Sequence, residues 1–170
     1  HSDMTRTVAL GYVNDEQRAI YNTVLKAQLA VIDGVHPGMR CCDVDKIARD
    51  IIETPYPNTF GHGLGHGVGF EIHEWPRFNK TDETICEPGM VITDEPGIYI
   101  PGKCGVRIED MLLITDDGCR SLTHSPKELI ILYYFMDSET YEQLPISPNV
   151  LGDNFRFVKE NMVCKVLSYK

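Results

Sequence analysis

Apolar and polar positions alternate at the start of the chain and then change to a helical spacing. Residues 3–10 (DMTRTVAL) alternate before Gly11, which predicts a β-strand. Beyond Asn14, apolar residues recur at helical spacing as far as about Ile32, and Gln17 stands where a capping box places its second member. The pattern therefore predicts a strand followed by a long helix.

A second helical stripe follows after a break at glycine and proline. Its apolar positions lie between Val44 and Ile52, the start is expected at Cys42 or Asp43, and Pro55 stops the helix. The stripe predicts a helix with one buried face.

From Phe60 the sequence becomes rich in glycine and histidine, FGHGLGHGVGFEIHEWP, with few residues that favour a regular helix. Strands are expected from Met90 (MVITDEPGIYI) and from Gly105 (GVRIEDMLLIT). A turn is expected at residues 116–118 and a short last strand at 119–123. Helices followed by a run of strands predict an α+β fold.

Composition narrows the classes of function. The 170 residues carry a formal net charge of -9, which argues against general affinity for nucleic-acid phosphates. No apolar run approaches the roughly 20 residues that a membrane-spanning helix needs. None of the six cysteines forms a C-x-x-C pair, so we interpret them as reduced thiols and expect a cytoplasmic protein.

Four residues with metal-binding side chains come from widely separated segments. Asp3, His66, Glu95 and Glu109 supply carboxylates and one imidazole, a donor set that hard or borderline divalent cations accept. Each residue alone has an ordinary explanation, because an isolated Glu is usually solvated and a lone His beside Gly is usually a hydrogen-bonded loop residue. Spacing alone therefore leaves a metal site and ordinary polar positions both open.

Other residues are candidates to assist such a site. His62 and His73 lie with His66 in one short glycine-rich stretch, which favours a metal-binding or catalytic role over ordinary loop positions. Arg107 precedes Glu109 by two residues, so in a strand the two side chains share a face. An arginine in that place could orient the metal-binding carboxylates.

Several segments, in order along the chain, resemble the signature segments of the pita-bread metallopeptidases of the aminopeptidase P and prolidase type. They are SDMTRT, FGHGLGHGVGFEIHEWP, PGMVITDEPGIYI, GVRIEDMLLIT and LTHSPKELI. The resemblance covers residues 1 to about 132. It implies a curved antiparallel sheet that holds the metal residues, with helices on the outer face of the sheet.

The resemblance implies a pair of divalent ions, with Mn expected first and Co, Zn or Fe as alternatives. On the matching positions, Asp3 and Glu109 would bridge the ions, while His66 and Glu95 would bind one of them. A metal-bound hydroxide would attack the carbonyl before proline.

The remaining candidates receive catalytic roles from the same resemblance. His62 and His73 would hold the substrate and stabilise the tetrahedral intermediate. Glu95 would act as the proton shuttle. Arg107 keeps the orienting role that its place on the strand face of Glu109 indicates.

The chain departs from the family pattern at one ligand. The family's first metal-binding Asp stands on a strand before the SDMTRT segment and is not in this sequence. We therefore expect one ion to bind with useful affinity and the second weakly or not at all. The strand that would pair with residues 3–10 is also expected to be missing, which would leave an exposed edge.

The segment from Tyr133 to Lys170 does not resemble the end of a peptidase. YYFMDSETYEQLPIS and NFRFVKENMVCKVLSYK resemble part of the OB domain of bacterial elongation factor P. We therefore expect a metallopeptidase core over residues 1–132 and a partial OB-type β segment over 133–170. The rest of that barrel is not in the sequence, so no translation function is carried over.

The predicted function is metal-dependent hydrolysis of Xaa-Pro bonds, at the N-terminus of peptides or in dipeptides. Proline-containing peptides are the expected partners, without nucleic acid or membrane, and a homo-oligomer stays open. The alternative is a pita-bread module that binds metal or peptide with little or no turnover, because a ligand is missing. A translation-related OB protein is disfavoured by the acidic charge.

Overall fold

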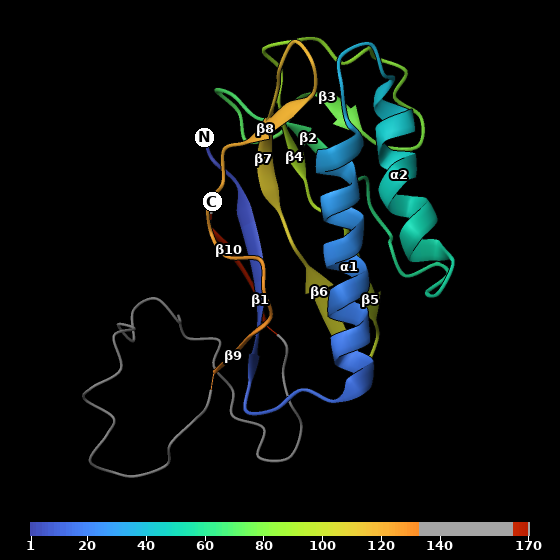
Figure 1. The fold of residues 1–170 in the computed structure, drawn as a ribbon, viewed down its shortest axis with the longest axis vertical. Coiled ribbons are helices and arrows are strands. Elements are labelled where there is room, and N and C mark those ends of the chain that lie inside the picture. The colour runs from blue at the N-terminus through green and yellow to red at the C-terminus, as the bar shows by residue number, and fades with distance from the viewer. Residues whose placement is uncertain (133–164, 170) are drawn as a thin grey trace, which may run out of the picture.

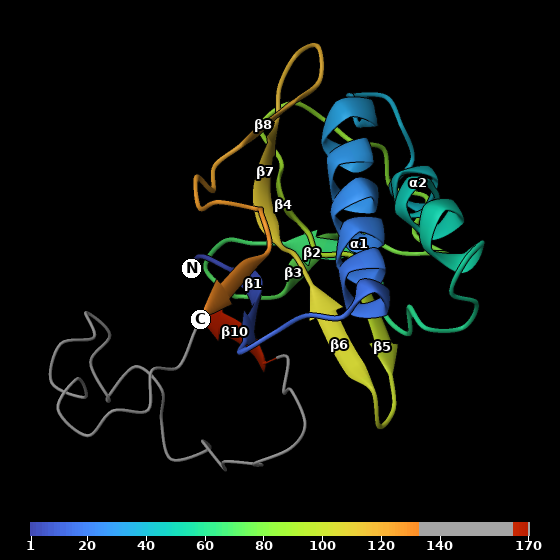
Figure 2. The ribbon, with the colours of Figure 1, turned by 60° about the horizontal axis from the view of Figure 1, so that its bottom comes forward.

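The computed structural model describes residues 1–132 and the backbone of residues 165–169. Within these ranges the two helices lie side by side and cover one side of the strands (Figures 1 and 2). Most of the OB-type segment expected over 133–170 falls outside the described residues. None of the described helices is long and apolar enough to cross a membrane.

The first helix, α1 (Asp15–Gly34), begins where the sequence predicts. The Asn14 side chain accepts a 2.8 Å hydrogen bond from the backbone N–H of Gln17, and the Gln17 side chain accepts one from the backbone N–H of Asn14. This reciprocal capping satisfies two backbone donors that a helix start otherwise leaves unpaired. The capping box is therefore confirmed.

The second helix, α2 (Cys41–Glu53), begins one residue before the earliest predicted start. Its N-cap Arg40 makes no side-chain capping bond. The backbone N–H groups of Cys41 and Cys42 instead donate to the carbonyls of Thr84 and Asp82, at 2.9 and 2.8 Å. A distant segment caps this helix, so no local sequence signal marks its start.

The described strands fall into three sheets. The order in the central sheet is β3-β2-β4-β7-β8; β10, β1 and β9 form a second sheet and β5 and β6 a third. Their bounds are β1 (Met4–Leu10), β2 (Gly65–Gly67), β3 (Glu74–Phe78), β4 (Val91–Asp94), β5 (Gly97–Ile100), β6 (Cys104–Arg107), β7 (Asp110–Ile114), β8 (Cys119–Ser121), β9 (Ile130–Leu132) and β10 (Lys165–Tyr169).

Two of the predicted strands are each divided in two. The stretch from Met90 becomes β4 in the central sheet and β5 in the two-stranded sheet, and the stretch from Gly105 becomes β6 and β7 in the same way. Glu95 lies in the first interruption and Glu109 in the second. Both glutamates therefore lie where the chain passes from one sheet to another.

The exposed edge expected beside residues 3–10 is not found. Strand β1 pairs in antiparallel fashion with β10, from Met4↔Tyr169 to Val8↔Lys165, and in parallel fashion with β9 on its other side. An isolated bridge also joins Thr5 to Glu109, which ties β1 to the start of β7.

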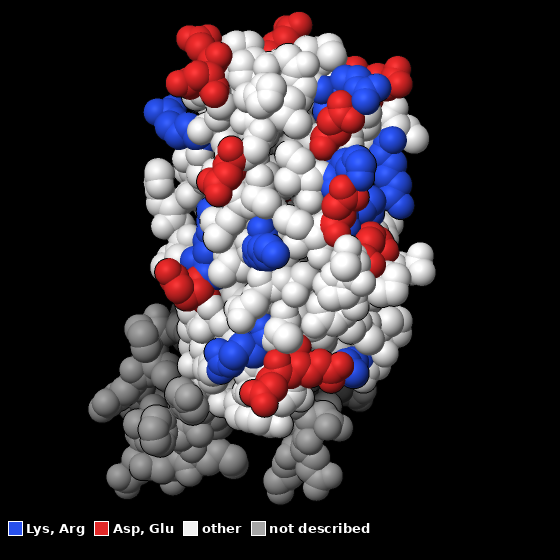
Figure 3. Space-filling view, turned by 45° about the vertical axis from the view of Figure 1, so that its right-hand side comes forward, with Lys and Arg blue, Asp and Glu red and all other residues white. Residues whose placement is uncertain are grey.

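The apolar core lies between the helices and the strands. The stripe on α1 that the sequence predicts is fully buried; it comprises Ile20, Val24, Ala27 and Val31. Each fully buried Val or Ile contributes about 1.5–3 kcal/mol relative to an exposed one. On the face seen in Figure 3, acidic and basic side chains are interspersed.

Candidate metal centre

The four predicted ligands come together from four separate segments. Asp3 immediately precedes β1, His66 is the middle residue of β2, Glu95 follows β4, and Glu109 immediately precedes β7. Asp3, His66 and Glu109 are buried, and the Glu95 side chain is 15% exposed. The fold thus gathers three acidic side chains and an imidazole at a place largely removed from water.

A close backbone contact sets the position of His66. An added Cβ at Gly65 would lie 1.8 Å from the carbonyl oxygen of Thr93, so only glycine lets β2 approach β4 here. The backbone N–H of His66 then donates to the Thr93 hydroxyl at 3.0 Å. A glycine before the ligand is therefore a steric requirement of the site.

The His66 ring presents a nitrogen to two carboxylates. Its Nδ1 lies 3.0 Å from the carbonyl oxygen of Gly67, which can only accept, so Nδ1 donates. Its Nε2 lies 3.3 Å from Glu95 Oε1 and 3.8 Å from Asp3 Oδ2. In the neutral ring Nε2 carries a lone pair, which the carboxylate oxygens repel. The arrangement is favourable only when a proton or a cation lies between the nitrogen and these oxygens.

Glu109 has one carboxylate oxygen with a partner and one without. Oε2 accepts a hydrogen bond from the Thr5 hydroxyl at 2.5 Å, whereas Oε1 is buried and has no hydrogen-bond partner. Burial, followed by the charge of Glu95, raises the pKa of Glu109 to about 7. An ionised Glu109 therefore needs a compensating positive charge close to Oε1.

These observations fit a divalent cation. Ligand atoms of His66, Glu95 and Glu109 lie within 4.8 Å of one another, and so do those of Asp3, His66 and His73. Carboxylates and a neutral imidazole whose far nitrogen is fixed by a carbonyl are the groups that Mn²⁺ and similar ions accept. The buried Oε1 of Glu109 has no hydrogen-bond partner, and such an ion would supply one.

His62 lies beside the cluster on the loop between α2 and β2. Its Nδ1 donates to the carbonyl of Gly63 at 2.7 Å, and its Nε2 is 2.8 Å from the Tyr99 hydroxyl. The Arg107 side chain is 3.5 Å from the same hydroxyl. Tyr99 therefore connects His62 with the arginine that borders the carboxylates.

His73, which immediately precedes β3, and Arg107, the last residue of β6, also border the cluster. The rings of His73 and His66 stack edge to face with centroids 4.4 Å apart, and His73 is exposed. Arg107 Nε lies 3.9 Å from Glu95 Oε2 and 4.0 Å from Glu109 Oε2. All seven predicted site residues, Asp3, His62, His66, His73, Glu95, Arg107 and Glu109, thus lie in one neighbourhood.

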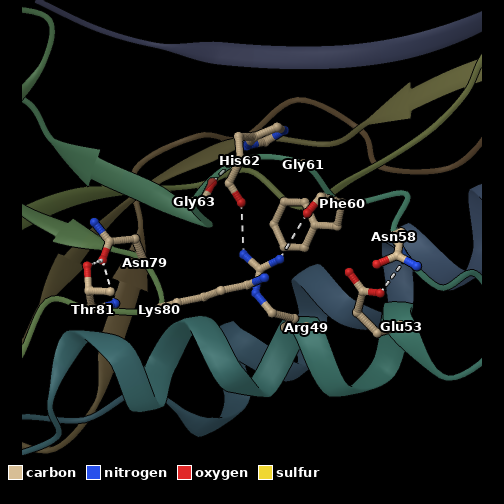
Figure 4. A pocket seen from close by; sticks show the side chains of 10 residues that line it. All are labelled: Arg49, Glu53, Asn58, Phe60, Gly61, His62, Gly63, Asn79, Lys80 and Thr81. Atoms are coloured by element: carbon tan, nitrogen blue, oxygen red, sulfur yellow. Dashed lines mark hydrogen bonds between the residues drawn. The ribbon is translucent and has the colours of Figure 1, made fainter.

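Side chains of α2 hold the loop that carries His62. Arg49 on α2 donates to the carbonyls of Phe60 and His62 at 2.9 and 2.8 Å (Figure 4). Asp45 holds the Arg49 guanidinium through an ion pair at 2.7 Å. Asp45 also accepts the backbone N–H of Leu64. A pocket of about 410 Å³ lies on this side of the loop, and the His62 ring points away from it.

Two threonines that sequence reasoning did not select contact the cluster. Thr5 bonds Glu109, and Thr93 lies 3.2 Å from Glu95 Oε1 and accepts the backbone N–H of His66. Each stands two residues from a predicted ligand in or beside a strand, Thr5 from Asp3 and Thr93 from Glu95. The period of two in strands was the signal that could have found them.

The charges of the cluster predict that the chain without metal is less stable at higher pH. The raised pKa of Glu109 gives stability that is complete below its ordinary pKa of 4.5 and is lost as pH rises through about 7. His66 acts in the same direction. Burial lowers its pKa, but the hydrogen bonds to Glu95 and Gly67 outweigh burial and raise the pKa overall.

In the presence of a chelator, the free energy of unfolding is therefore expected to fall by roughly 3 kcal/mol between about pH 4.5 and pH 8 on account of Glu109. Urea titrations at a series of pH values measure this slope. Glu109→Gln, which cannot ionise, is the control and should reduce the slope, leaving the parts that His66 and the buried Asp94 contribute. An equal slope in the two proteins would contradict the assignment to Glu109.

The sequence matches two family models. Residues 1–116 match the model of metallopeptidase family M24. Residues 131–170 match the model of the elongation factor P (EF-P) OB domain, in agreement with the resemblance of that segment.

Curated relatives agree with the first match. The chain is 53% identical over 131 residues to the Xaa-Pro dipeptidase of Pyrococcus furiosus, which covers 76% of this chain and 38% of that protein. It is 52% identical over 131 residues to the Xaa-Pro dipeptidase of Pyrococcus horikoshii, covering 76% and 37%. The chain therefore spans less than two-fifths of the length of these relatives.

Solved structures share the fold. The Xaa-Pro dipeptidase from Bacillus anthracis superimposes with a TM-score of 0.75 at 51% identity, covering 77% of this chain and 37% of that one. The prolidase from Pyrococcus furiosus gives a TM-score of 0.72 at 54% identity, covering 74% and 37%. The prediction of an α+β pita-bread fold is confirmed. Because the M24 model matches more than half of the sequence, the chain belongs to metallopeptidase family M24.

Proposed function

We propose that Asp3, His66, Glu95 and Glu109 hold a divalent cation, most readily Mn²⁺, in a peptidase that hydrolyses Xaa-Pro bonds. Membership of family M24 supports the metal dependence. The substrate class rests on relatives that are named Xaa-Pro dipeptidase and prolidase. Dipeptides and the N-terminal Xaa-Pro bond of longer peptides are the substrates that we infer.

One observation carries the proposal. The lone pair of His66 Nε2 faces the carboxylates of Asp3 and Glu95 at 3.8 and 3.3 Å, while Glu109 Oε1 is buried without a partner. Water is too far removed to solvate these groups well, and like charges crowded at low dielectric repel one another. A divalent cation that these atoms coordinate would remove both costs.

The bound cation would supply Lewis acidity, which polarises a carbonyl and makes water a nucleophile near neutral pH. The exposure of the surrounding side chains indicates which role each of them can take. Glu95 keeps 15% of its side chain exposed, so its carboxylate can accept a proton from water and return it to the leaving nitrogen. Glu109, at 2%, has much less access to water than Glu95 and serves as a ligand.

The histidines that border the cluster would hold the substrate. His62 keeps a fixed orientation through Gly63 and Tyr99, and exposed His73 stacks on His66. A hydrogen bond from the His73 imidazole, and one from His62 once its Nε2 leaves the Tyr99 hydroxyl, would orient the substrate and stabilise negative charge on the carbonyl oxygen. Arg107, close to both Glu95 and Glu109, would hold these carboxylates in place.

We also propose that the chain consists of two units, a metallopeptidase core over residues 1–132 and an OB-type segment over 133–170. The two family matches support this division, because the first ends at residue 116 and the second begins at 131. Function is assigned only to the first unit.

The test is hydrolysis of Ala-Pro by the purified chain, with Mn²⁺ added or removed and Ala-Ala as the comparison peptide. Release of proline that requires Mn²⁺ and exceeds release of alanine from Ala-Ala is the expected result. A calorimetric titration with Mn²⁺ runs alongside it. Mn²⁺ binding without hydrolysis would favour the alternative of a binding module, and absence of binding would overturn the metal site itself.

A further inference from the structure

Thr5 lies between a positive and a negative side chain of the cluster. Its hydroxyl is fully buried and is 3.1 Å from Arg107 Nε and 2.5 Å from Glu109 Oε2. Its backbone carbonyl also accepts the backbone N–H of Glu109 at 3.0 Å. One residue of β1 thus contacts both the main chain and the side chain of a predicted ligand.

The direction of the two hydroxyl bonds follows from chemistry. Arg107 Nε–H can only donate, so the Thr5 oxygen accepts from it. The single hydroxyl proton is then available to Glu109 Oε2, which accepts it. A charged donor on one side and a charged acceptor on the other strengthen both bonds, particularly where water is excluded.

This chain of bonds discriminates between the two oxygens of Glu109. Oε2 is held by Thr5, and Oε1 remains buried without a partner. Rotation of the carboxylate would break the hydrogen bond that the Thr5 hydroxyl donates to Oε2. The hydroxyl would still accept from Arg107 Nε–H, but its own proton would have no acceptor. The χ1 angle of a β-branched side chain is also restricted, which limits the freedom of the hydroxyl.

We propose that Thr5 is a positioning residue that fixes the Glu109 carboxylate so that Oε1 is presented to the cation. The inference rests on the proposed function, because it requires a cation among these ligands. Thr5 does not contact the cation or the substrate; it acts through Glu109. The alternative is that the Thr5 hydroxyl only satisfies buried polar groups, as many core threonines do.

The same strand provides a matched control. The Thr7 hydroxyl is also buried, donates to the carbonyl of Arg107 and accepts its backbone N–H, at 2.9 and 3.0 Å. It has no hydrogen bond to a carboxylate among the bonds found in the described part of the chain. Loss of either hydroxyl removes two hydrogen bonds that are at least partly buried, but only loss of the Thr5 hydroxyl releases Glu109.

The experiment measures the Mn²⁺ dissociation constant by calorimetry for the full chain and for Thr5→Val, Thr5→Ser and Thr7→Val. Thr5→Val is expected to bind Mn²⁺ about 10- to 100-fold more weakly, as loss of a residue that orients a ligand commonly does. Thr5→Ser, which restores the hydroxyl, and Thr7→Val should stay within about 3-fold of the parent. Thermal unfolding with a chelator should show similar losses for Thr5→Val and Thr7→Val.

A Thr5→Val protein that binds Mn²⁺ as tightly as the parent would overturn the positioning role while leaving the proposed function intact. Equal weakening by Thr5→Val and Thr7→Val would also overturn it, since the effect would then be structural. If the parent chain binds no Mn²⁺, the proposed function fails and this inference fails with it. Thr5→Ala removes the same hydroxyl from a smaller side chain and gives the same comparison if the valine variant does not fold.

Discussion

His66→Ala is expected to abolish measurable Mn²⁺ binding and, with it, any hydrolysis of Ala-Pro. The substitution removes the only neutral ligand of the proposed set and leaves Asp3, Glu95 and Glu109 without the nitrogen that faces them. Loss of residues that merely orient ligands already weakens metal binding by about 10- to 100-fold, so loss of a ligand should exceed roughly 100-fold. Calorimetry measures the binding, and release of proline measures the turnover.

His36→Ala is the matched control for this substitution. His36 is exposed, and its Nδ1 contacts only the carbonyl of the neighbouring Pro37. The control should bind Mn²⁺ as the parent does. Retention of the binding isotherm in His66→Ala would show that the cation is held elsewhere, and the assignment of the metal centre would be wrong.

The second large effect is expected on stability, from Arg6→Met. Arg6 pairs with the fully buried Asp110 at 2.7 Å. It also donates to four backbone carbonyls, those of Thr5, Glu109, Ser125 and Pro126. Removal of one partner of a buried ion pair leaves an uncompensated charge and costs about 3–5 kcal/mol. Urea denaturation of Arg6→Met with a chelator measures this loss.

Lys46→Met provides the comparison on the surface. Lys46 pairs with Asp50 on α2 at 2.5 Å, but both side chains are more than 60% exposed. Solvent screening reduces such a pair to about 0.5 kcal/mol or less. A loss below about 1 kcal/mol for Arg6→Met would mean that Lys127, 2.6 Å from Asp110, compensates the carboxylate alone.

The sequence predicts elements whose signals are local. The start of α1 follows from Asn14 and Gln17, and its buried stripe follows from the helical period. The start of α2 cannot be predicted in this way, because the carbonyls that cap it belong to residues about forty positions away. Long-range pairing of β1 with β10 is invisible to local patterns for the same reason.

The candidate site likewise has features that the sequence predicts and features that it does not. Residue types and the resemblance to pita-bread peptidases select the histidines, carboxylates and arginine that the structure brings together around His66, but not Thr5 or Thr93. They do not show that Glu95 and Glu109 lie between strands of different sheets, because a change of sheet is defined by the pairing partners of a strand, which local patterns do not show. They also do not show that Asp94, beside Glu95, is completely buried, since a carboxyl in that position of a strand is usually solvated.

The hydrogen bonds from Arg49 to the carbonyls of Phe60 and His62 affect the free energy of ligand binding. Gly61 and Gly63 give the backbone of this loop many accessible conformations, and ordering a residue costs about 1–2 kcal/mol of conformational entropy. Because α2 holds the loop through Arg49 and Asp45, that cost is met during folding. A ligand that meets His62 therefore binds to a loop that is already in place, and more of its interaction energy remains as affinity.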